Sequence, residues 1–280
     1  MSLAETFEIT RPSIVALGSK MAVTKQGQAP LFPTIYGTGF IVDNRGIVLT
    51  NRHVAEVLQN LPPHPRTGKP SAFALLYSNI EASEGVHGVR VFFIEVKGYN
   101  IPTTFTYEGD YYGEPMPDLA FLQLNVRDVP ALNLATEPNT IRIGMPIATA
   151  GFALGEVALT VYQKVNQITP LLRHGVVSSV FPFPCPQPHG FTVDIMTQGG
   201  ESGSPIFLAG SPVVVGLLHA GFDNTNITYA LPSLMLSHAL SSALSSGIMD
   251  LSDAPTFQSL VEQSGRNVAP SWEVIRDAAT

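Results

Sequence analysis

The hydrophobic positions of this chain fall in short runs of β-branched and aromatic residues that are separated by turn residues. Runs of this kind, bounded by Gly, Pro, Asn and Asp, are typical of β-strands. The residues from Asp43 to Gly46 separate two such runs and predict a hairpin turn. The runs predicted as strands are Ser13–Ala16, Gly39–Val42, Ile47–Thr50, Val89–Phe93, Leu119–Leu124, Gly175–Val180, Phe191–Ile195 and Val213–Leu218. We therefore expect an all-β fold.

Helical spacing is rare and is concentrated near the end of the chain. Apolar residues recur at helical intervals from Ser233 to Ser246, where Ser233 suits the N-cap and Gly247 suits the stop. Weaker patterns predict helices over 256–263 and near 272–278. Strands followed by one clear late helix indicate an all-β architecture, and they leave a sandwich and a pair of barrels equally open.

Composition and charge narrow the class of protein. With 45% hydrophobic and 13% charged residues among 280, the chain is a packed globular protein of one large or two small domains. The net charge of −7 and the lack of a dense basic run argue against binding to nucleic acid. No apolar stretch is long enough to span a membrane.

Cysteine usage and the first residues suggest the compartment. Cys185 is the single cysteine, so no internal disulfide forms, and we take it as a structural thiol. Residues 1–10 contain two acids and no apolar core, which is unlike a signal peptide. We expect a cytoplasmic protein.

Three local patterns carry candidate chemistry. His53 follows a predicted strand within Leu49-Thr50-Asn51-Arg52-His53-Val54. Asp118 opens an apolar strand within Pro117-Asp118-Leu119-Ala120. Ser202 lies in a glycine-rich turn, Gly199-Gly200-Glu201-Ser202-Gly203-Ser204-Pro205, before another strand. Asp110 is the nearest alternative acid, but no strand follows it.

These residue types suit acyl transfer. A serine hydroxyl is a weak nucleophile and needs an adjacent base, and an imidazole can take and return the proton near neutral pH. A buried carboxylate orients the imidazole and stabilises its charged form. Glycines before the serine let the backbone N–H groups of Gly200 and Ser202 converge on a developing oxyanion, each worth about 3–4 kcal/mol.

The order His53, Asp118, Ser202, with these flanking residues, resembles the trypsin-like serine peptidases, and most closely their Deg/HtrA-like branch. Further similarity lies in Asn139–Phe152, in His174–Ser179 and in Val215–Ser233, so that the resemblance covers roughly residues 14–246. It implies a serine endopeptidase that acts on polypeptides without a metal or cofactor. It also implies a chymotrypsin-like pair of six-stranded β-barrels with a C-terminal helix.

The resemblance also implies boundaries and a substrate pocket. The first barrel, with an N-terminal extension, would occupy residues 1–130, the second barrel and helix 131–247, and a tail 248–280. Extended substrate would add as a strand to the edge 217–221. The residues expected to contact substrate are Thr197, Gln198, Gly199, Leu218, His219, Ala220 and Gly221.

The chain departs from the family pattern in several ways. His53 and Asp118 lie farther apart than is usual, which predicts enlarged surface loops in 59–84 and 109–117. Glu201 stands where digestive enzymes carry an Asp that pairs with a newly cut N-terminus, and no matching activation site is visible. No PDZ-like segment fits after the helix. We expect no zymogen cleavage, and the sequence allows a homo-oligomer.

His219 has two interpretations. Some viral and glutamyl-specific relatives place a histidine on this pocket wall, with the spacing Gly-x-His, to bind Glu or Gln side chains. Here two residues separate Gly216 from His219. The imidazole therefore either contacts a substrate carboxylate or amide, or has a structural role in which it turns toward Asp118 or simply fills space. For the whole chain, the alternative to an active peptidase is a silent or partner-activated scaffold with the same fold.

Overall fold

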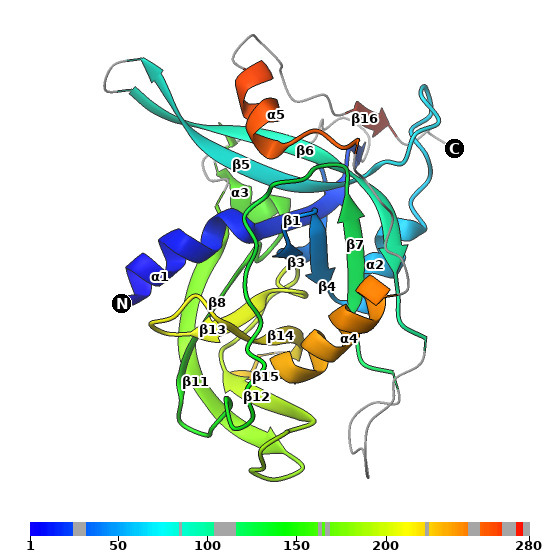
Figure 1. The fold of residues 1–280 in the computed structure, drawn as a ribbon. Coiled ribbons are helices and arrows are strands. Elements are labelled where there is room, and N and C mark those ends of the chain that lie inside the picture. Colours follow the sequence, from blue (N-terminus) through cyan, green and yellow to red (C-terminus); the bar gives the residue numbers. More distant parts are fainter. Residues whose placement is uncertain are drawn as a thin grey trace.

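The computed structural model describes residues 1–24, 32–83, 86–103, 116–161, 164–165, 169–221, 224–245, 253–264 and 273–276. Twelve of its strands form two closed antiparallel barrels of six strands each, arranged one above the other in Figure 1. The predicted all-β pair of six-stranded barrels with a C-terminal helix is confirmed.

The first barrel closes in the order β1-β3-β4-β7-β6-β5. Its strands are β1 (Ile14–Ser19), β3 (Ile35–Asp43), β4 (Ile47–Thr50), β5 (Ala72–Ser83), β6 (Val86–Asn100) and β7 (Ala120–Leu124). The predicted turn joins β3 to β4, and Gly46 adopts φ +84 there. Helix α2 (Arg52–Gln59) follows β4 directly and buries Val54, Ala55 and Leu58.

The second barrel closes in the order β11-β12-β15-β14-β13-β8. Its strands are β8 (Pro146–Gly151), β11 (Leu171–Phe181), β12 (Gly190–Asp194), β13 (Pro205–Leu208), β14 (Val214–Gly221) and β15 (Ile227–Pro232). Helix α4 (Ser233–Ser245) leaves β15 at the predicted residue and packs on β14 and β15. The domain boundaries near 130 and 247 stay predictions.

Short elements surround the barrels. Helix α1 (Leu3–Thr10) starts with a capping box between Ser2 and Glu5, and η1 (Arg11–Ser13) leads from it into β1. The others are α3 (Glu156–Leu159), α5 (Phe257–Gln263), the pair β9 (Thr160–Val161) and β10 (Lys164–Val165), and the parallel pair β2 (Met21–Thr24) and β16 (Glu273–Arg276). Helix α5 begins after the N-cap Thr256, close to its predicted start.

Two expectations from the sequence are wrong in part. The weak helical pattern near 272–278 contains β16, because Val274 and Ile275 pair with β2 and complete their backbone hydrogen bonds there. Within the expected loop 59–84, residues 72–83 form β5, which pairs with β6 in a long hairpin. The stretch 72–77 is buried on both faces, so it lacks the alternation that reveals a strand. Most of the loop 109–117, including Asp110, lies outside the described residues.

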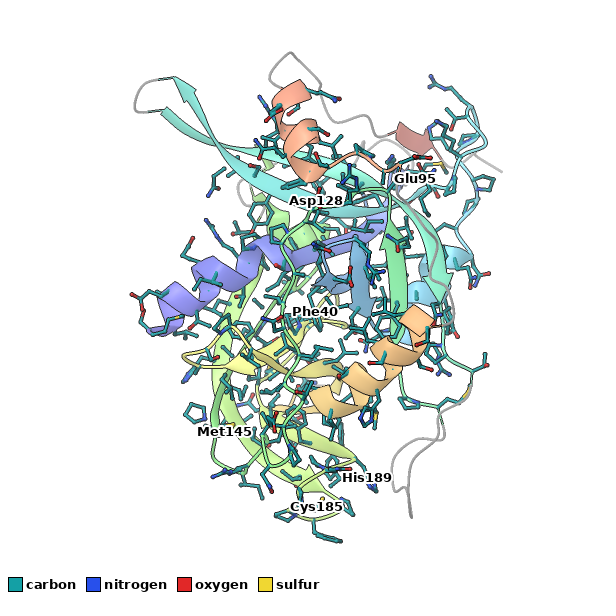
Figure 2. All side chains as sticks on the ribbon, viewed as in Figure 1. Phe40, Glu95, Asp128, Met145, Cys185 and His189 are labelled. Carbon is teal, nitrogen blue, oxygen red and sulfur yellow. The ribbon has the colours of Figure 1, made fainter. Side chains whose placement is uncertain are left out.

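One apolar cluster joins the two barrels. It contains Phe40 and Phe121 from the first barrel and Phe207 and Leu217 from the second. Ile41 belongs to a separate cluster with α2, because successive residues of a strand point to opposite faces. In Figure 2 Phe40 lies at the middle of the molecule. This shared core holds the barrels in one relative position.

The shared core predicts unequal effects for two phenylalanines. Phe40→Ala should lower the free energy of unfolding by about 3–5 kcal/mol, because Phe40 is fully buried between the barrels. Phe183→Ala is the matched control, because Phe183 is 64% exposed, and it should change stability by less than about 0.5 kcal/mol. Urea denaturation followed by circular dichroism measures both, and equal midpoints would contradict the assignment of Phe40 to the core.

Candidate active site

The candidate base His53 is placed by the junction of β4 and α2. Strand β4 ends at Thr50, and His53 is the second residue of the helix that starts at Arg52. Between them, Asn51 is fully buried, and its side-chain Nδ2 donates to the carbonyl of Asp118 at 2.8 Å. This hydrogen bond therefore holds Asp118, just before β7, close to His53.

His53 and Asp118 make a two-point contact. The backbone N–H of His53 donates to Asp118 Oδ1 at 3.1 Å, and the imidazole Nδ1 lies 2.8 Å from Oδ2. The side chain of Asp118 is 17% exposed and that of His53 is 51% exposed. With Nδ1 bonded to the carboxylate, Nε2 is left as the nitrogen that can accept a proton.

The contact shifts the pKa values of both His53 and Asp118. The hydrogen bond to Asp118 raises the pKa of His53 above its usual value, against the opposing effect of burial. Burial alone would raise the pKa of Asp118, but the hydrogen bonds and charge of His53 outweigh it and lower that pKa. The pair therefore favours a carboxylate beside a readily protonated imidazole.

His219 lies near the same carboxylate oxygen as His53. Its Nδ1 is 3.8 Å from Asp118 Oδ2, and its side chain is only 17% exposed. The charge of His219 also lowers the pKa of Asp118, although less than His53 does. Two imidazoles thus face one carboxylate.

Ser202 lies where the first barrel contacts the second. Its carbonyl accepts from the N–H of Thr38 in β3 at 2.9 Å. A Cβ placed on Gly37 would lie 2.7 Å from Val54 Cγ2, next to His53, and 3.1 Å from the Ser202 carbonyl oxygen. Only one strand backbone therefore separates the helix of His53 from the backbone of Ser202. Among the described residues no hydrogen bond joins the two side chains.

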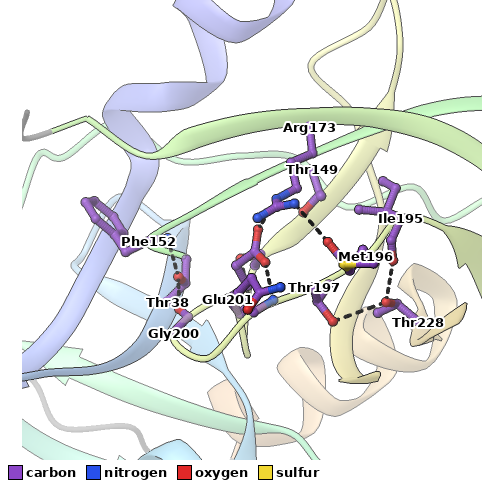
Figure 3. Close-up of polar contacts among 12 residues, drawn as sticks. Thr38, Thr149, Phe152, Arg173, Ile195, Met196, Thr197, Gly200, Glu201 and Thr228 are labelled. Carbon is purple, nitrogen blue, oxygen red and sulfur yellow. Dashed lines mark hydrogen bonds and ion pairs between the residues drawn. The ribbon is translucent and has the colours of Figure 1, made fainter. Parts of the chain in front are cut away.

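The turn before Ser202 has a defined form. The Glu201 N–H donates to the Gln198 carbonyl at 3.1 Å, and Gly200 adopts φ +93, as a type II turn requires. The carbonyl of Gly199 accepts from the N–H of Leu154 at 2.6 Å. The carbonyl of Gly200 accepts from Thr38 Oγ1 at 2.7 Å, as Figure 3 shows. We refer to residues 198–202 as the serine turn.

Both expected oxyanion donors are open on this turn. Within the described part of the chain, the N–H groups of Gly200 and Ser202 donate to no protein acceptor. The carbonyls of Gly199 and Gly200 accept from the Leu154 N–H and from Thr38 Oγ1. Two unpaired donors in a fixed turn can stabilise an oxyanion.

The expected pocket residues lie on two segments near the serine turn. Thr197 Oγ1 is 3.2 Å from Thr228 Oγ1 on β15, and Thr228 pairs in register with Gly221 on β14. This links the segment 197–199 to the segment 219–221. Leu218 differs from the others because its side chain is buried in the core, while its backbone bonds to Gly203 and Ser204.

Among the described residues, no group of three His, Cys, Asp or Glu could hold a metal ion. No helix in the described part of the chain is long and apolar enough to cross a membrane.

The sequence matches the family model of the trypsin-like peptidase domain over residues 37–217, which is more than half of the chain. The chain therefore belongs to the trypsin-like peptidase family. A comparison with curated proteins gives no match.

Solved structures share the fold at low sequence identity. The HtrA-type protease AlgW with a decapeptide matches with a TM-score of 0.57 and 17% identity, over 88% of this chain and 69% of that chain. AlgW with a tripeptide matches with a TM-score of 0.54 and 17% identity, over 88% of this chain and 65% of that one. The serine endoprotease from Yersinia pestis matches with a TM-score of 0.53 and 14% identity, over 88% and 68%. At these identities the likeness shows the fold alone.

Sequence reasoning did not assign three supporting residues. Thr38 bonds to the serine turn, Asn51 bonds to the backbone of Asp118, and Arg173 pairs with Glu201. Thr38 and Asn51 stand inside recognised motifs, but nothing local reveals their distant partners. Arg173 had a usable signal, because a buried acid beside the serine requires a positive partner from elsewhere.

The contact between His53 and Asp118 predicts a raised pKa for His53. In wild type, NMR of the His53 ring should give a pKa above 6.5, because Asp118 stabilises the protonated imidazole. Asp118→Asn should lower it, since the charged partner is lost while burial remains. Asp43→Asn is the control, because Asp43 pairs with Arg45 on a different turn and should leave His53 unchanged. An equal His53 pKa in wild type and Asp118→Asn would contradict the coupling.

Proposed function

We propose that the protein is a serine endopeptidase in which Ser202 is the nucleophile, His53 the general base and Asp118 the orienting acid. The observation that carries this is the two-point contact between Asp118 and His53, which holds the imidazole with Nδ1 on the carboxylate. A carboxylate in this position keeps the imidazole in the tautomer that accepts a proton at Nε2. Membership of the trypsin-like peptidase family supports the reaction class.

The proposed reaction follows from these roles. His53 takes the proton of Ser202 as the hydroxyl attacks the scissile carbonyl, and it then returns that proton to the leaving amine. The Gly200 and Ser202 N–H groups stabilise the oxyanion. Water then hydrolyses the acyl-enzyme. The absence of a hydrogen bond between His53 and Ser202 is compatible with this, since such bonds often shorten only when substrate binds.

The proposed substrate is an extended polypeptide. The exposed residues Ala220 and Gly221 end the β14 strand beside the serine turn, so a peptide can add there as a further strand. AlgW, a structural relative, was solved with a tripeptide and with a decapeptide. The cytoplasmic location and a homo-oligomeric state stay predictions.

Active-site labelling tests the nucleophile. A fluorophosphonate should label wild type at Ser202, while Ser202→Ala should not be labelled and His53→Ala should react at least about 100-fold more slowly, since the base is lost. Ser204→Ala is a matched control that should still be labelled, because Ser204 lies two residues after Ser202 and its hydroxyl is buried and bonded to the Glu201 carbonyl.

The labelling result separates the alternatives. No labelling of folded wild type under any condition would favour a silent scaffold. Labelling that appears only with an added partner would favour a partner-activated enzyme. Labelling of Ser202→Ala to the wild-type extent would disprove the assignment of the nucleophile.

His219 is expected to support Asp118 rather than to bind the substrate side chain, because its Nδ1 faces Oδ2 at 3.8 Å. His219→Ala should therefore lower kcat/KM for all peptides of a library by a similar factor. The alternative, binding of Glu or Gln side chains, requires wild type to prefer cleavage after those residues and His219→Ala to lose the preference. Cleavage-site profiling of both enzymes decides between the two.

A further inference from the structure

Glu201 is a buried acid immediately before Ser202. Its side chain is only 2% exposed, and burial raises the pKa of its carboxyl, partly offset by the Gln198 N–H and by Arg173. A charged carboxylate so deeply buried is costly unless it is paired and hydrogen-bonded. Its partners therefore decide whether the residue can occupy this position.

The two carboxylate oxygens of Glu201 have different partners. Oε2 accepts from the backbone N–H of Gln198 at 2.6 Å, and Oε1 lies 2.7 Å from Arg173 Nε. The first contact closes the serine turn on itself, because Glu201 also donates its own N–H to the Gln198 carbonyl. The second contact attaches the closed turn to β11, and Figure 3 shows Arg173 beside Glu201.

Arg173 is well placed to hold the turn. Its backbone pairs with Thr149 of β8, so the residue is anchored in the barrel sheet. One guanidinium nitrogen donates to the Met196 carbonyl at 2.9 Å, in the segment that leads into the serine turn. Arg173 thus contacts the chain on both sides of Gln198. Its side chain is 30% exposed, so small solutes can reach the site of the guanidinium.

The form of the serine turn depends on this attachment. The peptide between Gly199 and Gly200 is trans, so its N–H and its carbonyl point in opposite directions, and a rotation of this central peptide would present the carbonyl in place of the N–H. The φ of +93 at Gly200 belongs to the present orientation. A glycine pair permits that rotation at little cost. The contacts of Glu201 act on the two ends of this turn and oppose the rotation.

We propose that Arg173 is a positioning residue that, through Glu201, holds the serine turn in the form that presents the Gly200 and Ser202 N–H groups to the oxyanion. This inference rests on the proposed peptidase function. Because the positive partner comes from a strand of the same barrel, the turn is held by the folded barrel itself. Arg173 acts on the transition state through the turn and does not contact the reacting atoms.

Steady-state kinetics of Arg173→Gln and Glu201→Gln provide the first test. Both should lower kcat by about 10- to 100-fold with KM within about twofold, because part of the oxyanion stabilisation is lost and ground-state binding is retained. Arg173→Lys should recover part of the loss, since it keeps the charge. Arg45→Gln is the matched control, because it removes a guanidinium paired with Asp43 at 2.7 Å on a remote turn, and it should retain wild-type kinetics.

Chemical rescue distinguishes positioning from general stabilisation. Millimolar guanidinium should restore activity to Arg173→Ala through the partly exposed gap, whereas sodium chloride at the same ionic strength should not. Melting temperatures of all variants show whether the activity loss follows unfolding. A loss that follows unfolding, or an Arg173→Gln enzyme with the kinetics of Arg45→Gln, would overturn the proposal.

A crystal structure of Arg173→Gln tests the inference without activity. We expect the peptide between Gly199 and Gly200 to rotate, so that the Leu154 N–H loses its contact with the Gly199 carbonyl. A variant turn identical to that of wild type would overturn the inference, even if wild type cleaves peptides. The two proposals can also fail separately. If wild type is neither active nor labelled but the turn is rotated in Arg173→Gln, the role of Arg173 is upheld and the peptidase proposal fails.

Discussion

Thr38 makes the hydrogen bonds on which the arrangement of the site depends. It is fully buried in β3, its N–H donates to the Ser202 carbonyl, and its hydroxyl donates to the Gly200 carbonyl and accepts from Phe152. Its carbonyl accepts from Thr50, three residues before His53. A single residue therefore relates the strand that leads to His53 to the turn that carries Ser202. Gly203 makes this approach possible, because a Cβ there would lie 2.1 Å from the Thr38 carbonyl oxygen.

Two largely buried carboxylates shape the electrostatics around this junction, one in each barrel. Asp118 is compensated by His53, and the imidazole of His219 lies 3.8 Å from the same carboxylate oxygen. Glu201 is compensated by Arg173 and by the backbone of its own turn. Each acid has a partner on a segment other than its own, so each contact links two segments of the chain. The cost of burying an unpaired charge makes these contacts specific, even where they contribute little net stability.

The fold was predictable where local pattern and burial agree. The runs of β3, β4, β7, β12 and β14 are short, apolar and bounded by turn residues, and α4 shows helical spacing and a serine start. The hydrophobic pattern was uninformative where a segment is stabilised by contacts with residues far away in the sequence. Helix α1 is brief and rests on the shared core through Leu3 and Phe7, while β16 exists as a strand because it pairs with β2. Tertiary pairing overrides weak local preference in such short segments.

By itself the sequence determined most of the barrel strands, the family and the three residues in which chemistry was expected, because His53, Asp118 and Ser202 each stand in a motif a few residues long. The tertiary structure decided which of these meet and what supports them. It brings Asp118 onto His53 across 65 positions of the chain, turns His219 toward the same carboxylate, and supplies Arg173 to Glu201 from another strand. Hydrogen bonds and ion pairs act over a few ångströms of space, so partners that are remote along the chain become visible only when the barrels are closed.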